Sequence, residues 1–201
     1  MNYPVWDLAM GSGVLMAVVS VLHVFVSHFA VGGGLWLVLT ERKANASSDP
    51  DLRAHVITQS RFFLLITLVF GAITGVGIWF TAALISPHGI TALIRSYVWG
   101  WAIEWVFFVV ELSAAIIYWY GWNKLDRKTH EIVGWIYFVN AFMSLVVING
   151  IITFMLTPGG WLDNRVISPA FSNPTYCPSP ATPTFPPLPP PALAPPLATA
   201  L

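Results

Sequence analysis

The sequence predicts an all-α membrane protein with four transmembrane helices in an antiparallel bundle and both termini on the periplasmic side. Composition is the first reason: of 201 residues, 56% are hydrophobic and only 9% are charged, whereas about a quarter of the residues in a soluble domain are charged. Nine basic residues balance nine acidic ones, so no net field attracts a nucleic acid. The single cysteine, Cys177, excludes a disulfide framework or a CxxC site.

The second reason is the length of the apolar stretches. They cover residues 12–40, 62–86, 97–121 and 132–157. Each contains about 20 residues or more, enough for a helix to cross roughly 30 Å of hydrocarbon. We expect the first stretch to be a retained helix rather than a signal peptide, because no basic residue precedes Leu22 and the stretch contains two histidines.

The distribution of basic residues between the apolar stretches predicts how the helices are oriented in the membrane. We expect three loops between the helices, at residues 41–61, 87–96 and 122–131. Seven of the nine basic residues lie in the loops 41–61 and 122–131, whereas the loop 87–96 contains only Arg95 and the tail only Arg165. The positive-inside rule places both basic connections in the cytoplasm. The first and third helices therefore run inward, and the second and fourth run outward.

Composition changes abruptly after Trp161, because twelve of the sixteen prolines lie between Pro169 and Pro196. Such a segment forms polyproline or irregular structure. We therefore expect two parts: a four-helix bundle over residues 1–160 and a Pro-rich tail, irregular or disordered, over residues 161–201. The tail is either a periplasmic stalk or lid, or a sequence artefact such as an out-of-frame end.

Six polar side chains inside the apolar stretches are the candidate functional residues. They are His23 and His28 in the first stretch, Glu104 and Glu111 in the third, and Asn140 and Asn149 in the fourth. Such groups cost several kcal/mol in hydrocarbon unless they are paired or ligated. At a rise of ~1.5 Å per residue, His23, Glu104 and Asn149 all lie roughly 10–17 Å below the outer boundary. The small residues of the second stretch near this level are Gly71, Thr74 and Gly75, which let a planar group or another helix approach closely.

Spacing divides the candidates between two kinds of chemistry. Glu104 and Glu111 are seven residues apart, which puts them on one helical face about 10 Å from each other. That separation suits a proton path better than one metal site. His23 and His28 are about 140° apart around the helix, so at most one is an iron ligand. We expect a local hydrogen bond at His28, which follows Ser27.

Each candidate also has a structural interpretation. A lone histidine in a membrane helix can bond a carbonyl, the two asparagines can join helices, and Glu104 can pack against another subunit. We expect His55, His88 and His130 to be solvated loop residues. The convergence of His23, Glu104 and Glu111 nevertheless favours a metal or proton function.

At these positions the chain resembles the N-terminal half of cytochrome bd quinol oxidase subunit I, over residues 12–161. In the first two helices the resemblance rests on His23, on Gly32 and Glu41 nine and eighteen residues later, and on the run Phe70–Gly75. In the last two it rests on Ile103-Glu104, Phe107-Phe108, Glu111, the exit Tyr120-Gly121-Trp122-Asn123-Lys124-Leu125, Asn149-Gly150 and Pro158. Their order and spacing agree together, except that the two acids depart by one residue from the family pattern.

The resemblance implies the roles of these residues. His23 matches the proximal ligand of a high-spin haem, of b or d type. Glu104 matches a carboxylate at the haem site, and Glu111 matches an acid on the proton route from the cytoplasm. With Gly75 and Asn149, these residues form the expected cofactor site.

The resemblance further implies a bacterial inner-membrane respiratory complex that oxidises quinol and reduces oxygen, with other subunits as partners. The ligands of the low-spin haem and the quinol-binding loop belong to the half that this sequence lacks. The chain is then a fragment, a split half or a relative used in another complex. The alternative function is a non-catalytic membrane anchor or assembly subunit of another respiratory or electron-transfer complex.

Overall fold

The computed structural model describes residues 5–156, and every regular element in this range is a helix. The elements are α1 (Ser12–Ser47), α2 (Pro50–Leu65), the π-helical turn η1 (Ile66–Phe70), α3 (Gly71–Ile85), α4 (Pro87–Ser96), α5 (Val98–Gly121) and α6 (Arg127–Leu156). Four segments of this range are long and apolar enough to cross a membrane, at Ser12–Ser47, Pro50–Ile85, Val98–Gly121 and Arg127–Thr153. The prediction of four membrane-length helices is therefore confirmed. The tail expected over residues 161–201 lies outside the described residues.

A tight turn replaces most of the predicted connection 41–61. Helix α1 continues to Ser47 because residues 41–47 contain no helix breaker, and it ends at Ser48 in the left-handed conformation, with φ of 52°. The side chain of Asp49 then accepts hydrogen bonds from the backbone N–H groups of Asp51 and Leu52, with Pro50 in the first turn of α2. The expectation of a long loop was wrong because hydropathy detects only the apolar part of a helix.

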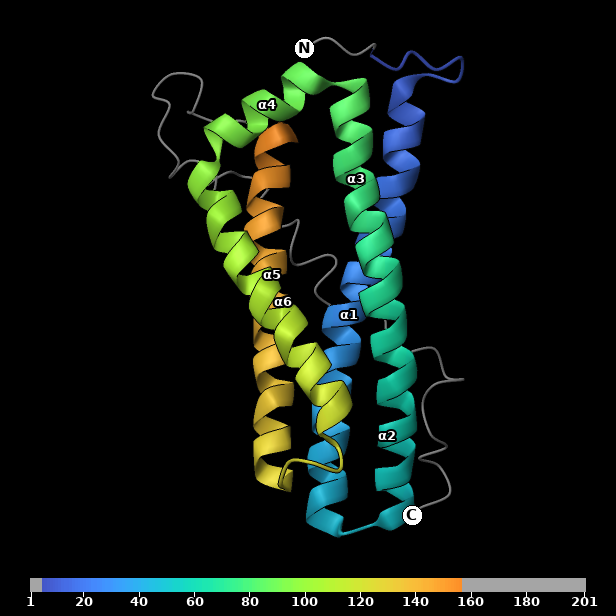
Figure 1. Ribbon diagram of the computed structural model, residues 1–201, viewed down its shortest axis with the longest axis vertical. Coiled ribbons are helices and arrows are strands. Elements are labelled where there is room, and N and C mark those ends of the chain that lie inside the picture. The colour runs from blue at the N-terminus through green and yellow to red at the C-terminus, as the bar shows by residue number, and fades with distance from the viewer. Residues whose placement is uncertain (1–4, 157–201) are drawn as a thin grey trace.

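The second correction concerns residues 87–96, which we expected to form a loop. They form α4, a short helix with Pro87 in its first turn. In Figure 1, α4 lies obliquely across one end of the molecule and joins α3 to α5. The segment is short and mixes polar with apolar residues, so hydropathy does not detect it as a membrane-spanning helix.

Helix α1 joins the α2–α3 segment to the α5–α6 pair. Helix α1 lies against α2 and α3, α5 lies against α6, and α1 also contacts α6. Figure 1 shows the start of α1 and helix α4 at one end of the molecule, and the α1–α2 and α5–α6 connections at the other. These two connections lie within the segments 41–61 and 122–131, which contain seven of the nine basic residues, so we call this end of the molecule the basic end.

The main apolar core lies toward the basic end. Its buried members are Leu37, Val56, Phe63, Leu64, Ala114, Ala115, Tyr118, Trp122 and Tyr137. Two glycines of α1 allow this packing. A Cβ atom at Gly33 would collide with the Phe63 ring, and one at Gly34 would lie 2.6 Å from Tyr137 Cε1. The rings of Phe63 and Tyr137 therefore pack directly against the backbone of α1.

Candidate functional site

His23 lies on α1, facing α3. Its Nδ1 is 3.0 Å from Thr74 Oγ1, and the Thr74 hydroxyl donates its own proton to the Phe70 carbonyl at 2.8 Å. The Thr74 oxygen must therefore accept from His23, so Nδ1 carries the imidazole proton and Nε2 keeps its lone pair. This is the way in which metal-binding histidines are commonly oriented, through the ring nitrogen that does not bind the metal.

Gly75 leaves room for this imidazole. A Cβ atom at Gly75 would lie 3.1 Å from His23 Cε1, a distance at which the ring would have to move. Thr74 and Gly75 of α3 thus hold and accommodate the ring. The expected proximity of His23 and Gly75 is seen in the structure.

His28 makes the local hydrogen bond that we expected. Its Nδ1 lies 2.7 Å from the carbonyl of Val24, one turn earlier in α1. A carbonyl can only accept, so this nitrogen carries the proton. The buried Nε2 of His28 has no hydrogen-bond partner within the described residues.

The two acids of α5 face α6. Ser144 on α6 donates a hydrogen bond to Glu104 Oε1 at 3.0 Å. Glu111 interacts electrostatically with Glu104 and with the buried Tyr137 of α6. Both carboxylates therefore belong to the α5–α6 pair, whereas His23 belongs to the α1–α3 pair.

The two asparagines of α6 differ in their surroundings. Asn149 is buried, and its backbone carbonyl accepts a hydrogen bond from Thr153. The Asn140 side chain is only partly buried and donates to the carbonyl of Ile136 in its own helix at 2.7 Å. Both partners of this hydrogen bond lie in α6, so the bond does not join two helices as the structural interpretation of the asparagines suggested.

The arrangement limits which metal group can bind. Among residues 5–156, no group of three or more His, Cys, Asp or Glu side chains is placed to hold a metal ion. A haem does not need such a group, because its porphyrin already holds the iron and the protein adds axial ligands. A single histidine with a free Nε2 next to a glycine fits that requirement.

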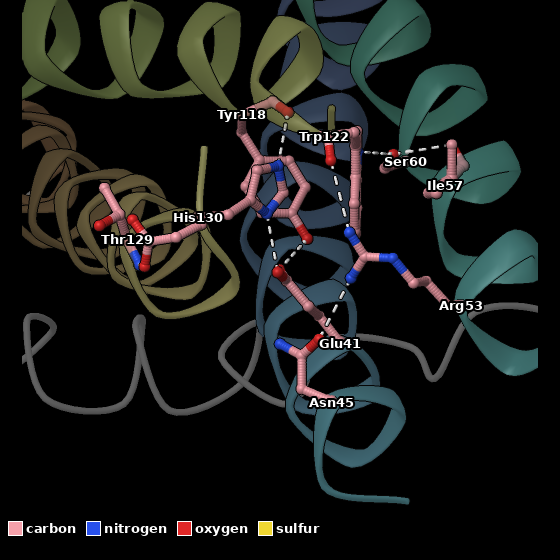
Figure 2. A network of polar contacts seen from close by, with 10 residues as sticks. Glu41, Asn45, Arg53, Ile57, Ser60, Tyr118, Trp122, Thr129 and His130 are labelled. Atoms are coloured by element: carbon pink, nitrogen blue, oxygen red, sulfur yellow. Dashed lines mark hydrogen bonds and ion pairs between the residues drawn. The ribbon is translucent and has the colours of Figure 1, made fainter. Parts of the chain in front are cut away.

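The sequence analysis missed a buried polar cluster at the basic end. Glu41, Tyr118 and His130 lie on α1, α5 and α6, with exposed fractions of only 1%, 2% and 2%. Tyr118 Oη donates to Glu41 Oε2 at 2.7 Å, and His130 Nδ1 lies 2.7 Å from Glu41 Oε1. His130 Nε2 donates to the Tyr118 carbonyl at 3.0 Å (Figure 2). We call these three residues the Glu41 cluster.

The position of His130 corrects the prediction that it is a solvated loop residue. Helix α6 begins at Arg127, with Asp126 accepting from the Thr129 N–H, so His130 points into the bundle from the first turn. Gly121 leaves space for it, since a Cβ atom there would lie 3.1 Å from His130 Cδ2. The signal that identifies this helix start is the Asp126 cap. His55 and His88 also lie in helices, α2 and α4.

A second set of contacts joins α2 to the cluster. Trp122 Nε1 donates to Ser60 Oγ at 2.9 Å, and the Trp122 ring lies 4.1 Å from the His130 ring between centroids. The guanidinium of Arg53 lies 5.4 Å from the centre of the Trp122 ring and donates to the Asn45 side chain (Figure 2). All four spanning segments therefore meet at this end.

A comparison with protein families gives the assignment. The model of the family described as cytochrome bd terminal oxidase subunit I matches residues 12–175. A comparison with curated proteins finds no match. The family match covers all four membrane-length helices and includes His23, Glu104 and Glu111, so the chain belongs to the cytochrome bd terminal oxidase subunit I family.

Proposed function

We propose that this chain binds a high-spin haem, of b or d type, through His23 Nε2 and conducts protons through Glu111 and Glu104. It does so as part of a cytochrome bd-like complex that couples quinol oxidation to oxygen reduction. The observation that carries the proposal is the Nδ1–Thr74 hydrogen bond, which leaves Nε2 of a family histidine free for iron.

The residues around His23 prepare the cofactor site. Thr74 holds the imidazole in one tautomer, and Gly75 leaves its ring unobstructed. Asn149 is placed by our depth estimate at the same level and supplies a buried polar group there. Haem, when bound, supplies the oxygen chemistry, and the protein contributes its ligand, its surroundings and a supply of protons.

The acids of α5 carry protons to the level of His23 in the membrane. Glu111 receives a proton from the cytoplasmic side and passes it toward Glu104, which Ser144 holds in place. In the proposed topology the helices alternate in direction across the bacterial inner membrane, and the basic end faces the cytoplasm. Proton uptake on that side alone generates voltage, since each charge moved is worth ~2.3 kcal/mol per 100 mV.

Other subunits complete the complex in this proposal and connect it to the quinol pool. The spanning helices expose large apolar side chains, including Phe25, Val76, Trp99 and Trp105, which suit a lipid bilayer or further membrane helices.

The test is the absorption spectrum of the assembled complex in membranes. We expect His23→Ala to remove the high-spin haem signal and His28→Ala, a matched change on the same helix, to keep it. Glu111→Ala should keep the haem content and slow turnover, because it removes a proton carrier but no iron ligand. An unchanged spectrum in His23→Ala contradicts the ligand assignment, and unimpaired turnover in Glu111→Ala contradicts the proton role.

The alternative, a non-catalytic anchor or assembly subunit, predicts a different spectrum. In that case the purified, folded chain is colourless and its polar residues pair with helices of a partner. A Soret band from the purified chain decides for haem binding.

A further inference from the structure

The polar residues between α5 and α6 are arranged as a ladder. On α5 they are Glu104, Glu111 and Tyr118, and on α6 they are His130, Tyr137 and Ser144, each set at intervals of seven residues. Hydrogen bonds join Tyr118 to His130 and Glu104 to Ser144 across the two helices. Between them, Glu111 of α5 lies close enough to Tyr137 of α6 for its charge to act on the phenol. Seven residues are two helical turns, so successive pairs lie about 10 Å apart along the helices.

From this arrangement we infer that the Glu41 cluster is a proton-holding station at the basic end of the ladder, from which protons reach Glu111. The inference rests on the proposed function and deepens it. It assigns a role to Glu41 and His130, two buried titratable residues that the proposed path through Glu111 and Glu104 does not use.

The hydrogen bonds determine how many protons the cluster holds. The Tyr118 carbonyl accepts only, so His130 Nε2 must carry a proton. Tyr118 Oη donates to Glu41 Oε2. The remaining contact, 2.7 Å between His130 Nδ1 and Glu41 Oε1, then contains one proton that either atom can hold. The pair is thus a carboxylate with an imidazolium, or a carboxylic acid with a neutral imidazole.

The cluster lies where a proton entering from the cytoplasm would first meet the ladder. Its three residues lie on α1, α5 and α6 within or near the segments 41–61 and 122–131, which contain seven of the nine basic residues. The charged groups from outside the cluster that act on its Tyr118 are Arg53 of α2 and Glu131 of α6. Glu131 points outward, with a quarter of its side chain exposed, and pairs with Arg42 at 3.9 Å. Surface water is therefore close to a buried pair of bases.

The proposed step moves one proton and no electrons. The shared proton leaves the Glu41–His130 pair as its bond to Oε1 or Nδ1 breaks, and an O–H bond forms on the Glu111 carboxylate. Water molecules bridge the distance of about two helical turns between the two pairs. The pair is then an anion, stabilised by the Tyr118 hydroxyl and by Arg53, until a proton from the cytoplasm restores it.

A glutamine at position 41 separates this role from a purely structural one. Its amide oxygen can accept from Tyr118 Oη, and its N–H can donate to His130 Nδ1, so the three hydrogen bonds of the cluster are kept. The amide cannot hold or release the proton. A structural clamp tolerates Glu41→Gln, and a proton station does not.

The experiment measures turnover and proton uptake in the assembled complex, with Asp51→Asn as the matched control on an exposed acid in the first turn of α2 at the same end. We expect Glu41→Gln to keep the haem spectrum and to slow both rates by about a hundredfold or more, the lower end of what one positioned proton-transfer group contributes. Asp51→Asn should stay within about twofold of the wild type, because this exposed side chain is outside the cluster and its charge is screened by water. Wild-type rates in Glu41→Gln overturn the inference.

A second measurement uses the unaltered complex, so it tests the inference even if the Glu41→Gln variant fails to assemble. The proton in a short Nδ1–Oε1 bond gives a strongly downfield NMR resonance that exchanges with water. We expect this resonance to disappear in D2O as soon as the sample is mixed, and its retention for hours would show a sealed clamp and overturn the inference. A complex without haem would contradict the proposed function instead, and the exchange measurement would still decide the role of the cluster.

Discussion

Gly33 shows how one residue controls the packing of two helices. The Phe63 ring occupies the place that a Cβ atom at Gly33 would take. Phe63 is buried, with an exposed fraction of 5%, and belongs to the main core with Tyr137. The ring therefore has little room to move aside.

We predict that Gly33→Ala destabilises the folded protein by about 1–3 kcal/mol, the usual cost of overpacking a core. The matched control is Gly13→Ala on the same helix, where a Cβ atom would meet nothing within 4 Å. Alanine is the better helix former, so this control should be neutral or stabilising. Thermal unfolding in detergent measures both variants, and equal melting temperatures would contradict the packing argument.

A hydrogen-bonded cap stabilises the first turn of helix α6, and the stability that this cap contributes depends on pH. Asp126 Oδ2 accepts from the Thr129 N–H at 3.0 Å. The hydrogen bonds from the Thr129 side chain and backbone lower the pKa of Asp126 from its ordinary value. This contribution to stability is present above the unfolded-state pKa of the carboxyl group. It is lost as pH falls through the lowered value in the folded protein.

We predict that Asp126→Ala lowers the melting temperature slightly at neutral pH and that the difference from wild type disappears in acid. The first turn of α6 also carries His130, so fraying there should loosen the Glu41 cluster. Asp7→Ala serves as the control, since it removes an exposed carboxylate outside the helices. A pH-independent difference would show that Asp126 acts through something other than its charge.

The distribution of basic residues predicts which end of the whole molecule faces the cytoplasm. The α1–α2 turn lies at the basic end, and the α3–α4 turn lies at the opposite end (Figure 1). Ser48 and Ser86 are exposed residues in these two turns. The positive-inside rule therefore predicts that Ser48 faces the cytoplasm and Ser86 faces the periplasm.

We expect a membrane-impermeant thiol reagent to label Ser48→Cys only from the cytoplasmic side and Ser86→Cys only from the periplasmic side. The background is Cys177→Ser, which removes the one native cysteine. Inside-out and right-side-out vesicles make the comparison. The reverse pattern would invert the topology and place the Glu41 cluster at the proton exit.

The sequence by itself determined the four membrane-length helices and the family, because hydropathy and motif spacing are local properties of the chain. It also contained the helix starts at Asp49 and Asp126, which hydropathy alone overlooks. Only the tertiary structure decided which polar groups meet. Glu41 and His130 are 89 residues apart, and their hydrogen bond exists because α1, α5 and α6 bring their ends together. A buried charge needs a partner, but nothing local in the sequence identifies one that comes from another helix.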